Sequence, residues 1–398
     1  MADSLELILA KHQAYLQRVA THTGNVSIDI IDSLNKELKV DLVDWLDANS
    51  EFKLTAKQQQ QVEVLTNKIR ATRGKAIDLA SEKLEVDMFD MAQREQVWLS
   101  GGLNTITGQT IATSSASALQ KMITRQAFDG AVIKQYYNKL SEDDTARIIS
   151  TVQRGLSDGL TLPQITNSVF GSKRLNYTDG VLQTTRNAVM NTQTGTNAGI
   201  VRTVTNGVNN ESKMMLYEAN SDIIKKVDYS ITFDGRTSDV CVSNSTKGIN
   251  GTSIYRMGTE PSLPAHPQCR TYYAPVIDGF EDIESTKPAV TDTRTRKDRE
   301  KAFRAEARDR GVKIGTVRKE WAKKNVKQVS DKLTFEQLLK TDKKFAYDWF
   351  GKTRYQLWES GAIPINGFVD VKGKTLTIQE LYEKDKSAFS KAGVKKPK

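Results

Sequence analysis

The chain of 398 residues has no proline before Pro163, and this restricts its fold more than any other feature. Proline interrupts helices because it lacks a backbone N–H donor, so a long proline-free region favours long helices. Apolar residues also recur there at helical spacing, from Leu5 to Leu46 and again from Val62 to Val97. We therefore expect residues 1–118 to be helical, with 55–98 forming one long helix or two stacked ones.

Helix boundary signals continue along the chain. A run rich in Gly, Thr and Ser from Gly101 to Ser117 predicts a flexible connection. Ser141 is followed by three acids, which predicts a helix start. Thr161 opens a capping-box pattern with an early proline and predicts a short helix that stops near Gly171. A further helix is expected over about 179–206.

Beyond residue 206 the apolar pattern changes its period. Apolar residues occupy every second position from Val227 to Phe233, which predicts a half-buried strand. A second strand is expected from Arg270 to Ile277. The fold class predicted from the whole pattern is α+β: helical first, then a small antiparallel core module over 207–285.

The strand that ends at Phe233 leads into the chemically most distinctive segment. Residues 230–275 hold both cysteines, one of the three histidines and four of the eight prolines. The order D-x-R-T-x-x-x-C, a loop, then P-x-H-P-x-C-R is similar to the core motif of the phage head morphogenesis family, the Mu F-like minor head proteins. The motif residues are Asp234, Arg236, Thr237, Cys241, Pro264, His266, Pro267, Cys269 and Arg270. Where many members carry two further cysteines, this chain has Asn244 and Thr271.

The region 332–390 resembles the family's C-terminal element. An aromatic-rich core, a hairpin-type turn at 372–374 and a capping box at Thr377 are predicted there. The matching residues are Gly351, Arg354, Tyr355, Gly361, Gly373, Leu376, Thr377 and Leu381. In the family's terms, 119–206 is the helical part of the head-morphogenesis domain, and 391–398 is a lysine tail.

The resemblance implies a non-enzymatic minor head protein in the phage head, made in the host cytoplasm. Its implied partners are the portal, other head proteins and packaged double-stranded DNA, with a role in DNA packaging or ejection. We expect the apolar stripe of residues 62–77 to dock partly on the portal. Two alternatives stay open: an enzyme on the same core, such as a metal-dependent nuclease or toxin-like effector, and a plain DNA-binding protein.

Cys241, His266 and Cys269 allow several interpretations. They supply three soft zinc ligands, with Asp234 or Asp239 as a possible fourth. A structural zinc site has four strong ligands, so this set is incomplete. A disulfide between the cysteines and a pair of buried free thiols are the other possibilities. Cysteine, histidine and acid also make a nucleophilic trio, but no cysteine-hydrolase signature flanks them. We expect no catalytic residues, no cofactor, and a structural ion pair between Asp234 and Arg236.

The net charge of +10 is concentrated in two places. Residues 286–330 contain 15 Lys and Arg against 6 Asp and Glu, and the last eight residues contain four lysines. We predict that 286–331 is an extended basic arm with helical pieces that binds DNA phosphates, a solvated linker being the alternative. The predicted DNA-binding residues are Arg294, Arg296, Lys297, Arg299, Arg304, Arg308, Arg310, Lys313, Arg318 and Lys319.

Two cysteines in 398 residues fit folding in a reducing compartment. No apolar run approaches the 18 residues of a membrane-spanning helix, so no membrane contact is expected. The first ten residues also lack the basic stretch of a signal peptide.

Overall fold

The computed structural model describes residues 5–49, 56–190, 199–277, 286–294, 296–330, 332–371 and 373–397. The chain forms two compact units. The helical unit comprises Tyr15–Ala219 and His266–Cys269, and the α+β unit comprises Met1–Ala14, Asn220–Ala265 and Arg270–Lys398. A helical majority with two small sheets confirms the predicted α+β class. Within the described ranges, no helix combines the length and apolar character needed to cross a membrane.

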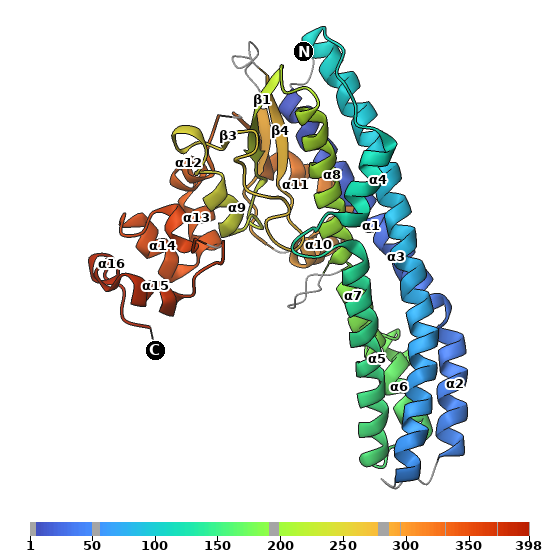
Figure 1. Ribbon diagram of the computed structural model, residues 1–398. Coiled ribbons are helices and arrows are strands. Elements are labelled where there is room, and N and C mark those ends of the chain that lie inside the picture. Colours follow the sequence, from blue (N-terminus) through green and yellow to red (C-terminus); the bar gives the residue numbers. More distant parts are fainter. Residues whose placement is uncertain are drawn as a thin grey trace. The chain divides into compact units, whose positions relative to one another are not determined.

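The helical unit is built along α3 (Ala56–Thr107), one helix of 52 residues, as Figure 1 shows. The connection predicted over Gly101–Ser117 is shorter than expected, because α3 continues through Gly101 and Gly102 to Thr107 and only residues 108–115 link it to the next helix. Each glycine costs about 1 kcal/mol relative to alanine in a helix interior. Burial of Leu99 and Leu103 on the same helix offsets this cost.

The other helices of the unit are α1 (Leu5–Ser33, from Tyr15 onward), α2 (Asn35–Ala48), α4 (Ala116–Arg125), α5 (Ile133–Ser157), α6 (Leu162–Phe170), α7 (Leu182–Met190) and α8 (Ile200–Glu218), with a short 3₁₀ turn η1 (Lys173–Leu175). Among them, α2, α4, α5 and α8 pack along α3. The stripe expected to dock on a partner is covered by these helices instead. Val62, Leu65 and Ile69 lie in one core with α2, α5 and α6. Ile77 lies in a second core with α4, α5 and α8.

α5 runs through Ser141 without a break, so the helix start predicted there was wrong. The acids that suggested it have other partners. Asp143 pairs with Lys139 on the surface at 3.3 Å. Asp144 is buried and its Oδ2 accepts from Arg73 Nε of α3 at 2.6 Å. Neither acid lies at a helix N-terminus: Asp143 makes a surface pair within α5, and Asp144 joins α5 to α3.

The charge of Arg73 is enclosed by a small polar network. Its side chain is fully buried. Arg73 Nη1 donates to Ile31 O at 2.8 Å and to Asn35 Oδ1 at 2.7 Å, joining α1 and α2 to α3. Thr185 Oγ1 of α7 donates to Asp144. One ion pair therefore holds five helices of the unit.

The short helix α6 is confirmed, with a capping box between Thr161 and Gln164 and an end at Gly171. The helix predicted over 179–206 is divided: α7 ends at Met190, residues 191–198 lie outside the described ones, and α8 continues past residue 206 to Glu218. α8 continues through Gly207, where the missing side chain makes room for Phe128, whose ring would lie 2.4 Å from an added Cβ.

The α+β unit contains the predicted antiparallel strands. β1 (Ile224–Ser230) lies between β3 (Ile254–Arg256) and β4 (Tyr272–Ile277), and both neighbours run antiparallel to it. Tyr229 of β1 packs edge-on against Tyr255 and Tyr273 from the two flanking strands. This sheet confirms the strands predicted at Val227–Phe233 and Arg270–Ile277, with shifts of a few residues at their ends.

A second sheet organises the basic segment. β2 (Phe233–Asp234) pairs in parallel with β5 (Thr286–Val290), which pairs antiparallel with β6 (Val326–Ser330). Between β5 and β6 the chain forms a helical hairpin of α10 (Arg296–Asp309) and α11 (Ile314–Asn325), with Phe303, Ala307 and Val317 at its core. The predicted extended arm is thus a folded β-α-α-β element attached to the motif strand.

The C-terminal region contains the predicted aromatic core and final capping box. Its helices are α12 (Phe335–Thr341), α13 (Lys343–Phe350), α14 (Lys352–Glu359), η3 (Ile365–Phe368), α15 (Ile378–Lys384) and α16 (Lys386–Lys391). Phe335 packs edge-on against Phe345, Trp349 and Phe233 of β2. The Thr377 cap with Glu380 is confirmed. Gly373 adopts a positive φ beside the Val369–Thr375 bridge, while Lys372 lies outside the described residues.

Candidate functional site

The first half of the motif lies at the end of β2 and in the turn that follows. Asp234 ends β2, Arg236 and Thr237 form the turn, and Cys241 lies in the first turn of α9 (Asp239–Asn244). Ser238 begins α9 because its Oγ accepts from the backbone N of Cys241 at 3.2 Å. Among the second-half residues that belong to the α+β unit, Pro264 lies in the β3–β4 loop and Arg270 lies just before β4.

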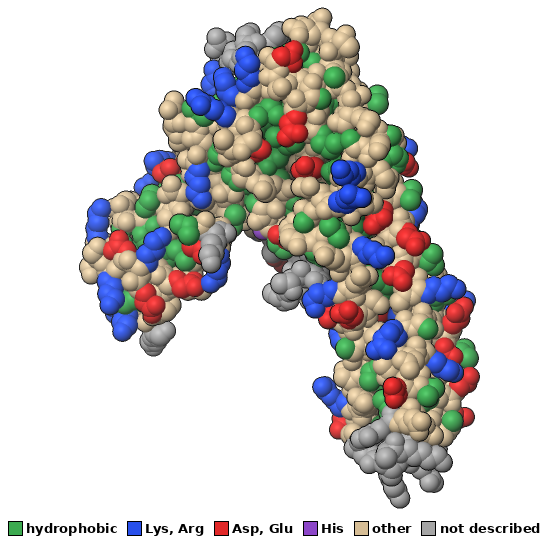
Figure 2. Space-filling model, in the orientation of Figure 1, with side chains coloured by type: hydrophobic (Ala, Val, Ile, Leu, Met, Phe, Trp, Pro, Cys, Tyr) green, Lys and Arg blue, Asp and Glu red, His purple; other side chains and the backbone are tan. Residues whose placement is uncertain are grey.

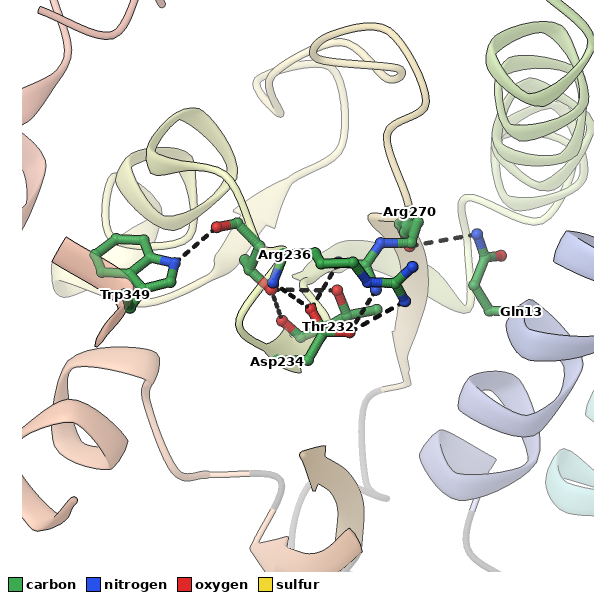
Figure 3. Close-up of polar contacts among 7 residues, drawn as sticks. Gln13, Thr232, Asp234, Arg236, Arg270 and Trp349 are labelled. Carbon is green, nitrogen blue, oxygen red and sulfur yellow. Dashed lines mark hydrogen bonds and ion pairs between the residues drawn. The ribbon is translucent and has the colours of Figure 1, made fainter. Parts of the chain in front are cut away.

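Asp234 and Arg270 form the centre of the motif, as Figure 3 shows. Arg270 Nη1 and Nη2 donate to the two carboxylate oxygens at 2.6 and 2.8 Å, a bidentate arrangement. The predicted partner Arg236 also contributes, because its backbone N donates to Asp234 at 2.9 Å and its side chain lies 3.4 Å away. The predicted Asp234–Arg236 pair is present, but Arg270 holds the carboxylate more closely.

The two arginines set the protonation of Asp234. Burial by itself raises the pKa of this carboxyl. The hydrogen bonds and charge of Arg270, with a smaller contribution from Arg236, outweigh burial and lower the pKa to about 2. Asp234 is therefore a firmly ionised acceptor at neutral pH, which suits a structural ion pair and not a general base.

The rest of the turn is fixed by hydrogen bonds within the α+β unit. Thr237 Oγ1 donates to Thr232 O across the turn. Trp349 Nε1 of α13 donates to Thr237 O at 2.9 Å (Figure 3). Arg354 Nη1 of α14 donates to Asp239 Oδ2 at 2.5 Å. The two segments that carry the resemblance are thus fastened to each other, and we call these contacts, together with the Asp234–Arg270 pair, the motif clasp.

At the two positions where many family members carry cysteine, this chain has other hydrogen-bonding groups. Thr271 Oγ1 donates to Cys241 Sγ at 3.1 Å. Asn244 Nδ2 donates to Tyr229 Oη at 3.4 Å. Cys241 is buried and forms no disulfide in this structure. Its neighbour in the α+β unit is a hydroxyl instead of a third thiol.

The other residues of the second half belong to the helical unit. His266 Nδ1 lies 2.9 Å from Pro267 O. The backbone N of Gln268 donates to Thr203 Oγ1 of α8 at 2.9 Å. Burial lowers the pKa of His266, but its hydrogen bond with Cys269 and that residue's charge outweigh burial, so the pKa is raised. His266 is therefore a hydrogen-bonded turn histidine.

The predicted set of zinc ligands divides between the two units, with Cys241 in the α+β unit and His266 and Cys269 in the helical unit. The two predicted fourth ligands do not complete it. Asp234 is engaged by Arg270, and Asp239 by Arg354. A structural zinc site has four ligands, and the donor set here offers two thiols and one imidazole. Zinc fits these residues incompletely.

We accordingly expect purified protein to contain well under one zinc per chain. Elemental analysis of protein prepared without chelator measures this directly, and Thr271→Cys is the informative companion because it supplies the thiol present in many family members. A stoichiometric zinc content in the unaltered chain, lost on His266→Ala, would show that three protein ligands suffice.

Part of the charge predicted to bind DNA is already partnered inside the arm. Three of the ten predicted cations lie in ion pairs on the described surface. Asp292, the partner of Arg294, accepts a second hydrogen bond from Trp321 Nε1 at 2.6 Å. The hydrogen bond from Arg294 is the largest of the effects that lower the pKa of Asp292 to about 2. The pairs are Arg294–Asp292 at 2.7 Å, Arg310–Glu306 at 2.6 Å, Arg310–Glu320 at 2.7 Å and Arg318–Glu300 at 2.6 Å.

The other predicted cations have different surroundings. Arg299 lies over the ring of Trp321, 5.0 Å from its centroid, and helps to close the hairpin. The side chain of Arg296 lies outside the described ones. The remaining five point to solvent: Lys297, Arg304, Arg308, Lys313 and Lys319.

Sequence reasoning missed two contacts of the site and one residue of the basic segment. Trp349 and Arg354 donate hydrogen bonds to the motif segment from more than 100 positions away in the sequence. No local sequence pattern predicts such a contact. Lys301 was absent from the predicted DNA-binding set although it is exposed on α10. Its helical spacing from Lys297 was a signal that could have identified it.

Comparison with protein-family models, curated protein sequences and solved structures finds no match to this chain.

Proposed function

We propose that this chain is a non-enzymatic minor head protein of a phage, which acts by binding in head morphogenesis. The observation that carries the proposal is the motif clasp. The two segments that resemble the head-protein family lie far apart in the sequence, yet they bind each other through residues of the motif itself. Trp349 reaches Thr237, and Arg354 reaches Asp239.

The chemistry of the clasp supports a binding role over a catalytic one. A general base needs a pKa near the working pH, whereas Asp234 is held by Arg270 with its pKa lowered to about 2. The thiol of Cys241 accepts a hydrogen bond from Thr271 within its own unit. The polar groups of the motif are thus used to hold a platform, on which surfaces for other head components can be carried.

The expected partners are the portal and packaged double-stranded DNA, and the expected location is the virion head. The test is co-expression of the full chain with the portal and the major capsid protein of the same phage, followed by isolation of heads. We expect the chain to sediment with heads in low copy and to be retained by the portal alone. Its absence from heads, together with no retention by the portal, would contradict the proposal.

A matched pair of variants makes the test specific. Trp349→Phe removes the indole donor to Thr237 while retaining an aromatic side chain, whereas Tyr347→Phe changes a half-exposed residue on the same helix. Reduced head incorporation by the first variant alone would link the clasp to assembly. Metal-dependent cleavage of plasmid DNA by the purified chain would instead support the nuclease alternative.

A further inference from the structure

One face of α10 is positively charged along its whole length. We propose that Lys297, Lys301, Arg304 and Arg308 together bind the phosphate backbone of double-stranded DNA, and we call these four residues the α10 basic face. The inference rests on the proposed function, because packaged DNA is the partner that a head protein meets.

The spacing of the four residues places them on one line. They occupy positions i, i+4, i+7 and i+11 of α10, which fall within an arc of about 60° on a helix of 3.6 residues per turn. Their side chains are all exposed. The line extends about 16 Å along the helix axis at 1.5 Å per residue. A row of cations of this length matches a run of several phosphates on one duplex groove edge.

The two glutamates of α10 pair with arginines outside the α10 basic face. Glu300 pairs with Arg318 of α11 at 2.6 Å, and Glu306 pairs with Arg310 at 2.6 Å. In the described part of the arm, none of the four residues of the α10 basic face takes part in an ion pair. Arginines that looked equally available in the sequence neutralise Glu300 and Glu306, so these two acids do not compensate the charge of the α10 basic face.

Duplex DNA fits this face better than a lipid surface does. A membrane-binding amphipathic helix needs a free apolar side beside its cations. The apolar side of α10 is already covered, because Phe303 and Ala307 pack on Val317 within the hairpin. The surface in Figure 2 offers a contrast, since along the long helices of the helical unit Lys and Arg alternate with Asp and Glu. Such mixed surfaces attract polyanions weakly.

The test compares two variants that lower the net charge equally. One carries glutamine at Lys297, Lys301, Arg304 and Arg308. The control carries glutamine at four exposed lysines of the C-terminal helices: Lys344, Lys352, Lys384 and Lys386. Binding of the full chain to a labelled duplex of random sequence is followed by fluorescence anisotropy over a series of salt concentrations. Circular dichroism checks that both variants remain folded.

Four phosphate contacts correspond to a slope of about −3.6 in log K against log salt, or about a hundredfold loss of affinity between 50 and 200 mM salt. We expect the α10 variant to lose about this much slope and at least about tenfold in affinity at low salt. The control is expected to keep the slope of the unaltered chain. Equal slopes for all three proteins, or equal losses in both variants, would overturn the assignment.

Two further measurements separate this inference from the proposed function. Vesicles of phosphatidylserine replace the duplex in the same assay, and binding to them as tight as to DNA, abolished in the α10 variant, would overturn DNA as the partner. Head incorporation of the α10 variant is measured alongside. Incorporation without DNA binding by the unaltered chain refutes only the inference, whereas DNA binding without incorporation refutes only the proposed function.

Discussion

Asp144→Ala is expected to lower the free energy of unfolding of the helical unit by about 3–5 kcal/mol, the usual result of removing one partner from a buried ion pair. Asp144 and Arg73 are 1% and 0% exposed, and their Nε–Oδ2 distance is 2.6 Å. Without the carboxylate, the guanidinium stays buried with its charge uncompensated. Urea unfolding combined with hydrogen exchange of peptides from α3 and α5 measures the loss within this unit.

The neighbouring residue supplies the control. Asp143→Ala removes an acid from the same turn, but its pair with Lys139 is 35% and 56% exposed. Exposed pairs contribute about 0–1 kcal/mol, so this variant should unfold almost like the unaltered chain. A similar loss in both variants would show that the helix itself, and not the Arg73 network, responds to substitution.

Arg270→Ala is expected to destabilise the α+β unit by about 2–3 kcal/mol, somewhat below a fully buried pair. Each partner is 16% exposed, and the bidentate bonds to Asp234 are 2.6 and 2.8 Å long. Arg236→Ala is the matched control, because it removes the same charge from the same carboxylate. Its side chain is 60% exposed and 3.4 Å away, so less than about 1 kcal/mol is expected.

The same pair predicts a pH dependence. The pKa of Asp234 falls from 3.8 to about 2 on folding, so the unfolded chain binds more protons between these values. The stabilising effect of the Asp234–Arg270 ion pair is complete above pH 4 and is lost as the pH falls through about 2. The unfolding free energy of Arg270→Ala should therefore depend less steeply on pH in this window. An unchanged slope would assign the acid sensitivity to other carboxyls.

Much of the fold could be predicted because its signals are local. The capping boxes at Thr161 and Thr377 were identified correctly, since each depends on residues within one helical turn. The alternation that predicts β1 is equally local. Errors arose where a side chain interacts with a residue far away in the sequence. Ser141 and the acids after it resemble a helix start, but Asp144 forms a buried ion pair with Arg73, 71 residues earlier.

The candidate site shows the same division. The residues of the motif could be named from the sequence, and the partner of Asp234 could not, because Arg270 lies 36 residues away. The DNA-binding residues were predicted from charge density alone. Charge density does not reveal that Arg310 and Arg318 neutralise acids within the hairpin, nor that Lys301 completes a line with Lys297.

The α+β unit takes its first segment from before the helical unit and the rest from after it. Gln13 Nε2 of α1 donates to the backbone O of Arg270 at 3.3 Å, across 257 positions of sequence. On a ribosome that adds about 5–20 residues per second, Gln13 therefore waits roughly 13–50 s before its acceptor is made. Leu9, fully buried in the finished protein, has no completed unit to cover it during that interval. Gln13 and Leu9 thus reach their final surroundings only after the segment around Arg270 has been made.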